Sequence, residues 1–189
     1  METNTYKRLK DKKQDNFPEY LIIHHGGGTD TEPLLDTSHH TANIMESWHL
    51  SKGWEGLGYH LVIHEDGEVW KGRPEHYHGS HARGYNTKSI GICLSGNFDA
   101  KLPTDEQVEA LRKLLLDLSE KYGIPKENIV PHRKFANKTC YGKLLDDDWA
   151  SSLLIEKEDD QVTKFKKEIA DQQVIIDTLI DIIRKWFKK

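Results

Sequence analysis

Residues 59–70, YHLVIHEDGEVW, are the stretch that most strongly indicates the fold. Apolar and β-branched residues on both sides of Asp66-Gly67 predict two strands, and this pair suits the positive φ angles of a tight hairpin turn. Two other short apolar runs, residues 20–24 (YLIIH) and 89–94 (SIGICL), predict buried strands. The hairpin is therefore expected to be one part of a larger sheet.

Two helices are predicted between and after these strands. Residues 41–52 place apolar side chains at helical spacing. Residues 104–122 carry a longer apolar stripe, which starts with a capping box formed by Thr104 and Gln107 and ends at Gly123. Because strands and helices interleave over about 130 residues, the sequence predicts an α/β domain with one sheet covered by helices.

The composition excludes several classes of protein. At roughly 100–200 residues per domain, 189 residues support one globular domain with a modest appendage. The formal net charge of −4 argues against a protein that mainly binds nucleic acid, and no apolar run approaches the roughly 20 residues of a transmembrane segment. Two cysteines cannot form a disulfide scaffold, so we expect a reducing compartment. The 11 histidines are many for this length, and some of them are candidates for chemistry.

Shifts in composition divide the chain into four segments. Residues 1–16 are basic and almost without apolar residues, which predicts a mobile tail. Residues 17–150 form the predicted catalytic domain, and residues 151–160 form a charged linker. Residues 161–189 repeat apolar residues at spacings of three and four, which is the pattern of a heptad seam on an amphipathic helix.

Three interpretations of residues 161–189 stay open. The helix packs on its own domain, it forms a coiled coil or bundle that makes the chain a homo-oligomer, or it binds a membrane surface. The seam consists of Val162, Phe165, Ile169, Gln172, Ile176, Leu179, Ile183 and Trp186. Ile175 and Ile180 widen the apolar face, which favours burial against more than one surface.

A few residues carry the donor atoms that zinc prefers. His24 or His25 lies where a predicted strand runs into a glycine-rich loop, and His132 and Cys140 lie eight residues apart. Catalytic zinc sites use three such ligands and leave the fourth position to water. Only one of His24 and His25 can face the site, because successive strand residues point to opposite faces. Spacing alone favours the ordinary interpretation, a solvent-facing His132 and a half-buried Cys140.

Neighbouring residues strengthen the metal hypothesis. Lys138 is two residues before Cys140, so an extended segment would place its ammonium group beside the metal. Tyr59 opens the first hairpin strand, where a phenol can project from the end of the sheet. An activated water together with donors for an oxyanion is a general means of amide hydrolysis. Cys93 lies inside an apolar strand and is interpreted as a core residue instead.

An ordered set of motifs resembles a known family. The motifs are LIIHH (residues 21–25), GYHLVI (58–63), DGEVWKGR (66–73), GSHARGYN (79–86), SIGICLSG (89–96), PH (131–132) and KTC (138–140). Together they resemble zinc-dependent N-acetylmuramoyl-L-alanine amidases of the phage-lysozyme type, relatives of animal peptidoglycan recognition proteins. The match covers roughly residues 18–150.

The resemblance implies a fold and a reaction. The fold would be a mixed central β-sheet flanked by helices, with a groove for the stem peptide of peptidoglycan. The reaction would be hydrolysis of the amide bond between N-acetylmuramic acid and L-alanine. One zinc ion would be held by His24, His132 and Cys140, a match that favours His24 over His25.

The resemblance also implies roles for residues around the zinc ion. Tyr59 and Lys138 match the catalytic pair of the family, and His81 and Asn86 match the segment that lines the substrate groove. One departure concerns the residues after the cysteine ligand, where the family often has Pro-Gly and this chain has Tyr141-Gly142. The departure bears on the path of the loop, since the thiolate is retained.

The leading hypothesis is a peptidoglycan hydrolase that resembles an endolysin. The alternative is a non-catalytic peptidoglycan-binding module, although relatives that do not cleave typically lack the cysteine ligand. A structural zinc site is disfavoured because such sites usually have four protein ligands. The first residues lack the apolar core of a secretory signal, so we expect a phage enzyme that stays in the cytoplasm until lysis and then acts on the cell wall. A bacterial remodelling enzyme is the alternative origin.

Overall fold

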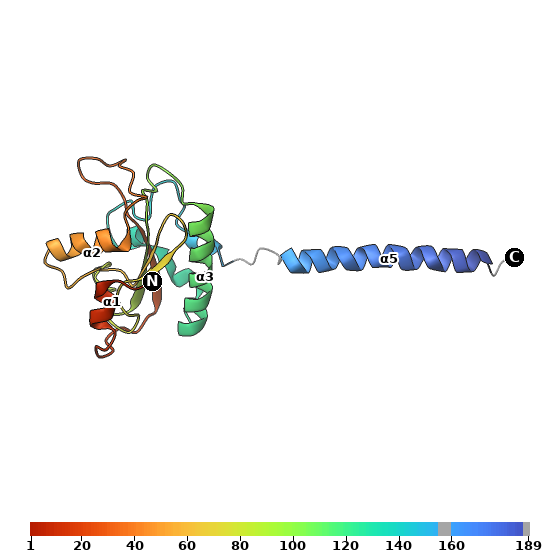
Figure 1. The fold of residues 1–189 in the computed structure, drawn as a ribbon, viewed down its shortest axis with the longest axis horizontal. Coiled ribbons are helices and arrows are strands. Elements are labelled where there is room, and N and C mark those ends of the chain that lie inside the picture. Colours follow the sequence, from red (N-terminus) through yellow and green to blue (C-terminus); the bar gives the residue numbers. More distant parts are fainter. Residues whose placement is uncertain (155–159, 187–189) are drawn as a thin grey trace. The chain divides into compact units, whose positions relative to one another are not determined.

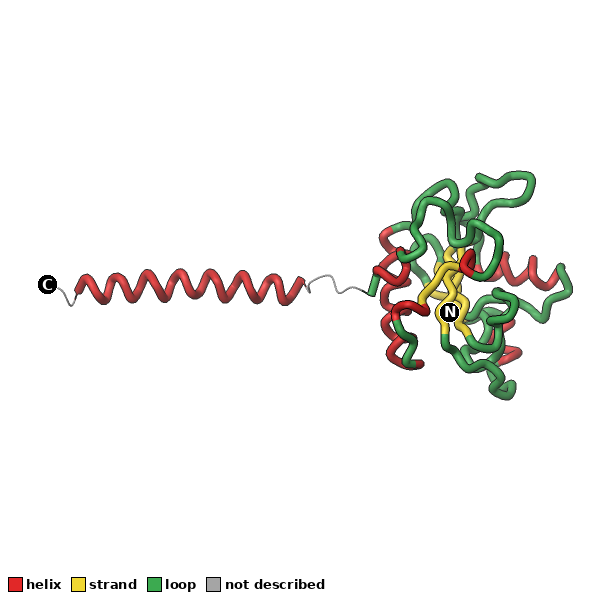
Figure 2. Tube along the Cα trace, turned by 180° about the vertical axis from the view of Figure 1, so that it is seen from behind, coloured by secondary structure: helices red, strands yellow, loops and turns green. Residues whose placement is uncertain are grey.

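The computed structural model describes residues 1–154 and 160–186. The chain divides into two compact units, Met1–Leu154 and Ile155–Lys189. In the first unit the strands gather at the centre, with loops and helices around them (Figures 1 and 2). The described part of the second unit is a single helix.

The central sheet has five strands in the order β3-β2-β4-β1-β5. The strands are β1 (Tyr20–His25), β2 (Leu61–Ile63), β3 (Val69–Lys71), β4 (Ser89–Leu94) and β5 (Ile129–Pro131). Strands β2 and β3 are antiparallel, whereas β2–β4, β4–β1 and β1–β5 are parallel pairs. The predicted hairpin is present, and its turn contains Gly67 at a φ of +81°. The predicted mixed α/β sheet is confirmed.

The two predicted helices cover opposite faces of this sheet (Figure 1). Helix α2 spans Ala42–Ser51, and helix α3 spans Asp105–Tyr122. The capping box of Thr104 and Gln107 is formed at the start of α3, and Gly123 ends the helix at a φ of +65°. Shorter helical segments are α1 (Asn4–Leu9), η1 (Lys126–Asn128), η2 (His132–Lys134) and α4 (Trp149–Ser152).

Successive side chains of β1 point to opposite faces of the sheet, so one face holds the main core and the other holds the predicted metal ligand His24. Leu21 and Ile23 are buried in the larger core, beneath the apolar stripe of α3. Ile22 belongs to the other face, where it packs with Ala82 and Val130. Since side chains alternate along a strand, His24 lies on the same face as Ile22. The sheet therefore presents His24 away from its main core.

The N-terminal segment is packed on the domain, which corrects the prediction of a mobile tail for residues 1–16. Helix α1 is capped by Thr3, whose backbone N–H also donates to the carbonyl oxygen of Lys71 in β3. Thr5 hydrogen-bonds through its N–H and hydroxyl to the buried carboxylate of Glu46. Leu9 is buried. Backbone pairing and polar contacts hold this segment, and neither is visible in its low apolar content.

Helix α5 spans Asp160–Trp186 and forms the described part of the second unit (Figure 1). Its large apolar side chains with described surroundings are exposed, and their exposed fractions range from 40% to 66%. They are Ile169, Val174, Ile175, Ile176, Leu179, Ile180 and Ile183. Of the predicted seam, the side chains of Val162, Phe165 and Trp186 lie outside the described residues. Among the described residues, no helix is apolar and long enough to cross a membrane.

The buried His60, whose ring contacts Gly91 of β4, makes the free energy of unfolding depend on pH. The ring of His60 accepts a hydrogen bond from Gly91 N–H through Nδ1 (2.9 Å), and its Nε2 faces the carbonyl oxygen of Tyr77 (3.0 Å). Burial lowers the pKa of His60 from 6.5 to about 4. The unfolded chain therefore binds the proton more readily, so stability present above pH 6.5 is lost as the pH falls towards 4.

We predict that the His60→Asn variant loses less stability on acidification than the unmodified chain. At about 1.4 kcal/mol per pKa unit, His60 accounts for roughly 3 kcal/mol of unfolding free energy between pH 7 and 4. Urea unfolding from pH 7.5 to 4, with a chelator present, measures this slope. Equally steep losses for the two proteins would contradict the assignment.

Candidate metal centre

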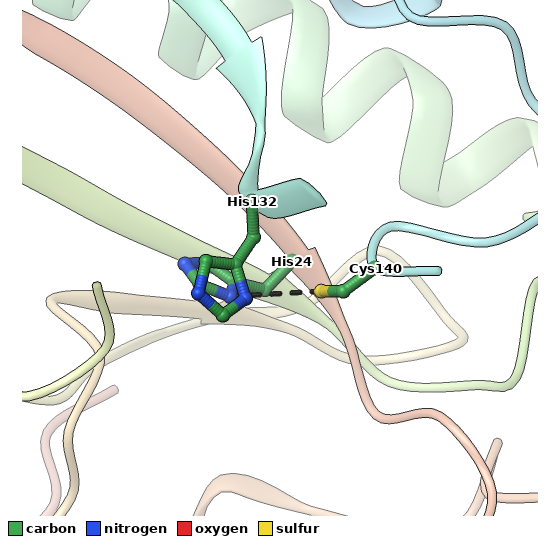
Figure 3. A group of neighbouring side chains, drawn as sticks. All are labelled: His24, His132 and Cys140. Atoms are coloured by element: carbon green, nitrogen blue, oxygen red, sulfur yellow. Dashed lines mark hydrogen bonds between the residues drawn. The ribbon is translucent and has the colours of Figure 1, made fainter. Parts of the chain in front are cut away.

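The structure brings the three predicted metal ligands together (Figure 3). One ligand atom from each of His24, His132 and Cys140 lies within 4.8 Å of the other two. His24 is the next-to-last residue of strand β1, and His132 follows directly after β5, which pairs in parallel with β1. The two histidines meet because parallel neighbours end at the same edge of the sheet.

The spacing of the donor atoms fits a tetrahedral zinc ion. Cys140 Sγ lies 3.6 Å from His24 Nδ1. Two ligands at tetrahedral angles, with zinc–nitrogen near 2.05 Å and zinc–sulfur near 2.3 Å, would be separated by about 3.6 Å. The set of two nitrogens and one sulfur is a ligand combination of catalytic zinc sites, and it leaves one position for water. The donor set therefore fits zinc in its chemistry, and the spacing of His24 and Cys140 fits it in geometry.

Burial keeps both imidazoles in the form that binds a metal. The pKa of His24 lies well below 6.5, first because of burial and then because of His81, His132 and other histidines nearby. The pKa of His132 is lowered by burial and by the charge of Lys138. At neutral pH each ring is therefore uncharged and offers a lone pair to a cation.

The thiol of Cys140 needs a cation to ionise. Burial raises its pKa to about 12, while a hydrogen bond from the backbone of His25 and the charge of Lys138 act in the opposite direction. A divalent ion at this position favours the thiolate, so binding releases a proton. The side chain of His25 lies on the opposite face, where Nδ1 accepts from Phe98 N–H at 2.9 Å.

Arg133 fixes the loop that carries Cys140. Its backbone N–H donates to the carbonyl oxygen of Cys140 at 2.7 Å. Its guanidinium donates to the carbonyl oxygens of Gly142 and Leu145, both at 2.6 Å, and to the carboxylate of Asp147 at 2.5 Å. Arg133 was not among the predicted site residues, although its place directly after a ligand histidine was a usable signal.

Tyr141, the departure from the family pattern, anchors the same loop. Its side chain is fully buried, and its ring lies edge-on to Trp149 at a centroid distance of 5.4 Å. Its hydroxyl donates to the carbonyl oxygen of Asp146 at 2.8 Å. The bulky residue therefore fills the core and holds the path that lets Cys140 reach the histidines.

Tyr59 lies beside the ligand cluster. Its ring centroid is 5.0 Å from that of His24. Burial raises the pKa of Tyr59 well above 10, and the nearby thiols of Cys93 and Cys140 raise it further. The phenol therefore keeps its proton at neutral pH and can donate a hydrogen bond to a substrate oxygen.

Lys138 is placed at the border of the site. Its side chain is exposed and lines an open cleft of about 500 Å³ together with Arg133, Thr139 and Lys143. Its charge acts on the pKa values of both His132 and Cys140. It is thus close enough to influence the ligands electrostatically from the solvent side.

The two predicted substrate-binding residues make their polar contacts within the protein. His81 Nδ1 lies 3.0 Å from His24 Nε2, and His81 Nε2 lies 3.3 Å from the hydroxyl of Ser89. The side-chain oxygen of Asn86 accepts the backbone N–H groups of His81 and Ala82, both at 2.9 Å. Ser89 was not among the predicted site residues, because the apolar run around it indicates only a buried strand.

The fold and the donor set first define a class, an α/β domain with a three-ligand metal centre of the catalytic kind. Residues 14–143 match the family described as N-acetylmuramoyl-L-alanine amidase. The chain belongs to this family, which confirms the resemblance seen in the motifs.

Individual relatives agree with this assignment. An endolysin of Enterobacteria phage K11 is 41% identical over 101 residues, which are 51% of this chain and 66% of the endolysin, just under two thirds. The peptidoglycan-recognition protein SC2 of Drosophila melanogaster is 33% identical over 67% of this chain and 70% of its own length. The solved amidase LysCS from Clostridium intestinale superposes with a TM-score of 0.61 at 30% identity, covering 69% of this chain and 79% of LysCS.

We predict that replacing Cys140 by alanine removes zinc binding, whereas replacing Cys93 by alanine does not. Both thiols are near the site, but Cys140 alone is a member of the ligand cluster among the described residues. The affinity should fall by more than about 100-fold, beyond the range typical of outer-shell changes. Competition with a chromogenic chelator measures it, and equal affinities for the two variants would contradict the ligand assignment.

Proposed function

We propose that this chain hydrolyses the amide bond between the lactyl group of N-acetylmuramic acid and L-alanine in peptidoglycan. We further propose that one zinc ion, held by His24, His132 and Cys140, is its cofactor. The observation that carries the proposal is the partly buried three-ligand cluster next to Tyr59, within a domain of the amidase family. When bound, zinc supplies Lewis acidity, which activates water and polarises a carbonyl group.

The residues around the cluster have complementary tasks in this proposal. Tyr59, protonated because of its burial, donates a hydrogen bond to the carbonyl oxygen as negative charge develops on it. Lys138 contributes a positive charge from the open cleft and orients anionic or carbonyl groups of the substrate. The similarity to phage endolysins supports the bacterial cell wall as the place of action.

Digestion of purified cell wall tests the activity. The zinc-loaded chain should release stem peptides with a free L-alanine amino group, and a chelator should stop the release. Tyr59→Phe should lower kcat on the order of 10²–10³-fold, the usual effect of losing one oxyanion donor. His64→Leu, a change directly after β2 at a ring that contacts Ala42 and not the ligand cluster, serves as a control that should retain activity. Wall binding without any release would instead identify the non-catalytic module.

We also propose that α5 joins copies of this chain through its apolar face. The exposed Ile176, Leu179 and Ile183 follow the predicted seam, and the flanking Ile175 and Ile180 are exposed as well. Burying an isoleucine or leucine side chain stabilises an assembly by roughly 1.5–3 kcal/mol. A face of this width is suited to a bundle of several helices.

We predict that the full chain is oligomeric and that Ile176→Glu makes it monomeric. Thr178→Glu is the matched control, because it adds the same charge outside the seam and should leave the assembly intact. Light scattering coupled to size-exclusion chromatography gives the masses. A monomeric mass for the unmodified chain would exclude self-association through α5.

A further inference from the structure

A chain of hydrogen bonds leads from the metal cluster into the domain. His24 Nδ1 faces the thiol of Cys140, and His24 Nε2 lies 3.0 Å from His81 Nδ1. His81 Nε2 lies 3.3 Å from Ser89 Oγ, and the Ser89 hydroxyl is 2.7 Å from the carbonyl oxygen of Tyr85. One side of the first imidazole is thus turned to the metal position and the other to a second imidazole.

The hydrogen bond from Ser89 to Tyr85 determines which atom is the donor in each of the other hydrogen bonds of this series. A carbonyl oxygen only accepts, so the Ser89 hydroxyl donates to Tyr85 and its oxygen accepts from His81 Nε2–H. A neutral imidazole carries one N–H, so His81 Nδ1 has a lone pair and accepts from His24 Nε2–H. His24 Nδ1 is then left with its lone pair directed at the metal position.

Two glycines make the space for the ring of His81. A β-carbon at Gly91 would lie 2.6 Å from His81 Cγ, and one at Gly79 would lie 2.7 Å from His81 Nε2. Neither glycine has a positive φ, so backbone conformation does not require glycine at these positions. The space that a side chain would take at either position is filled by the imidazole of His81.

The backbone of His81 is held as firmly as its ring. Asn86 Oδ1 accepts from the N–H groups of His81 and Ala82, and the Asn86 carbonyl oxygen accepts from Gly79 N–H at 2.8 Å. Through these three hydrogen bonds, Asn86 at the end of the loop (residues 79–86) holds the segment in which His81 lies. The loop therefore presents the ring in one orientation.

We propose that His81 is a positioning residue that selects the metal-binding tautomer of His24, with Ser89 and Asn86 as its supports. The proposal rests on the metal site of the proposed function. A neutral histidine has two tautomers, and the one protonated at Nδ1 would direct a hydrogen atom at the metal position. An acceptor fixed at Nε2 favours the productive tautomer and raises the basicity of Nδ1. Both ring nitrogens of His81 have hydrogen-bond partners within the protein, His24 and Ser89, so we assign His81 the task of orienting His24.

Zinc affinity of full-length variants tests the proposal without any use of activity. His81→Leu keeps the bulk but removes the acceptor, and we expect a 10–100-fold loss of zinc affinity. His81→Asn places an oxygen near the position of Nδ1 and should bind zinc more tightly than the leucine variant. Ser89→Ala leaves the ring in place but frees its tautomer, so it should show a smaller loss. His64→Leu is the control and should bind zinc like the unmodified chain.

Nitrogen-15 NMR of the histidine rings supplies a second readout on the metal-free and zinc-loaded chain. We expect His24 to be protonated at Nε2 in both states, and in the metal-free Ser89→Ala protein we expect a mixture of tautomers. A merely structural role for His81 would change stability but neither readout. Unchanged zinc affinity in His81→Leu, or a His24 ring protonated at Nδ1, would overturn the proposal. If the unmodified chain binds zinc and shows the expected tautomer of His24 but does not hydrolyse cell wall, only the proposed function is contradicted.

Discussion

The parallel pairing of β1 with β5 is the constraint on which the site depends. Their register sets Ile23 beside Pro131, so the residues that come next, His24 in β1 and His132 directly after β5, lie at the same edge of the sheet. Two ligands are thus placed by backbone hydrogen bonds rather than by flexible loops. Only Cys140 has to be delivered by a loop, and the contacts of Arg133 with that loop supply the fixed path.

Burial then sets the chemistry that this placement allows. It lowers the pKa values of the two histidines and raises that of Tyr59, so the site holds neutral ligands beside a protonated donor. A buried imidazole must also be turned with the correct nitrogen towards the metal position, since its two ring nitrogens differ in protonation. The contact between His24 and His81 meets this need and links the ligand to the interior of the domain. The same face of the sheet therefore provides position, protonation state and orientation.

Much of this could be predicted from the sequence. Hairpin, capping box and buried apolar runs are local signals, and they gave β1 to β4, α2 and α3 close to their observed bounds. Strand β5 was not predicted, because its three residues, which end in Pro131, are too few to show the alternating apolar pattern of a strand. The packing of residues 1–16 depends on pairing with β3, a contact between distant segments that composition cannot reveal. The ligands followed from motifs in order, whereas the roles of Ser89 and Gly91 become visible only when the ring of His81 is placed between them.

The central claim is that this domain holds one zinc ion through two imidazole nitrogens and one thiolate. X-ray absorption at the zinc edge of the loaded full-length chain tests it most directly. We expect one sulfur at about 2.3 Å and three lighter ligands at about 2.0–2.1 Å, two of them with the scattering pattern of imidazole. A first shell without sulfur, or one with two or more sulfurs, would contradict it.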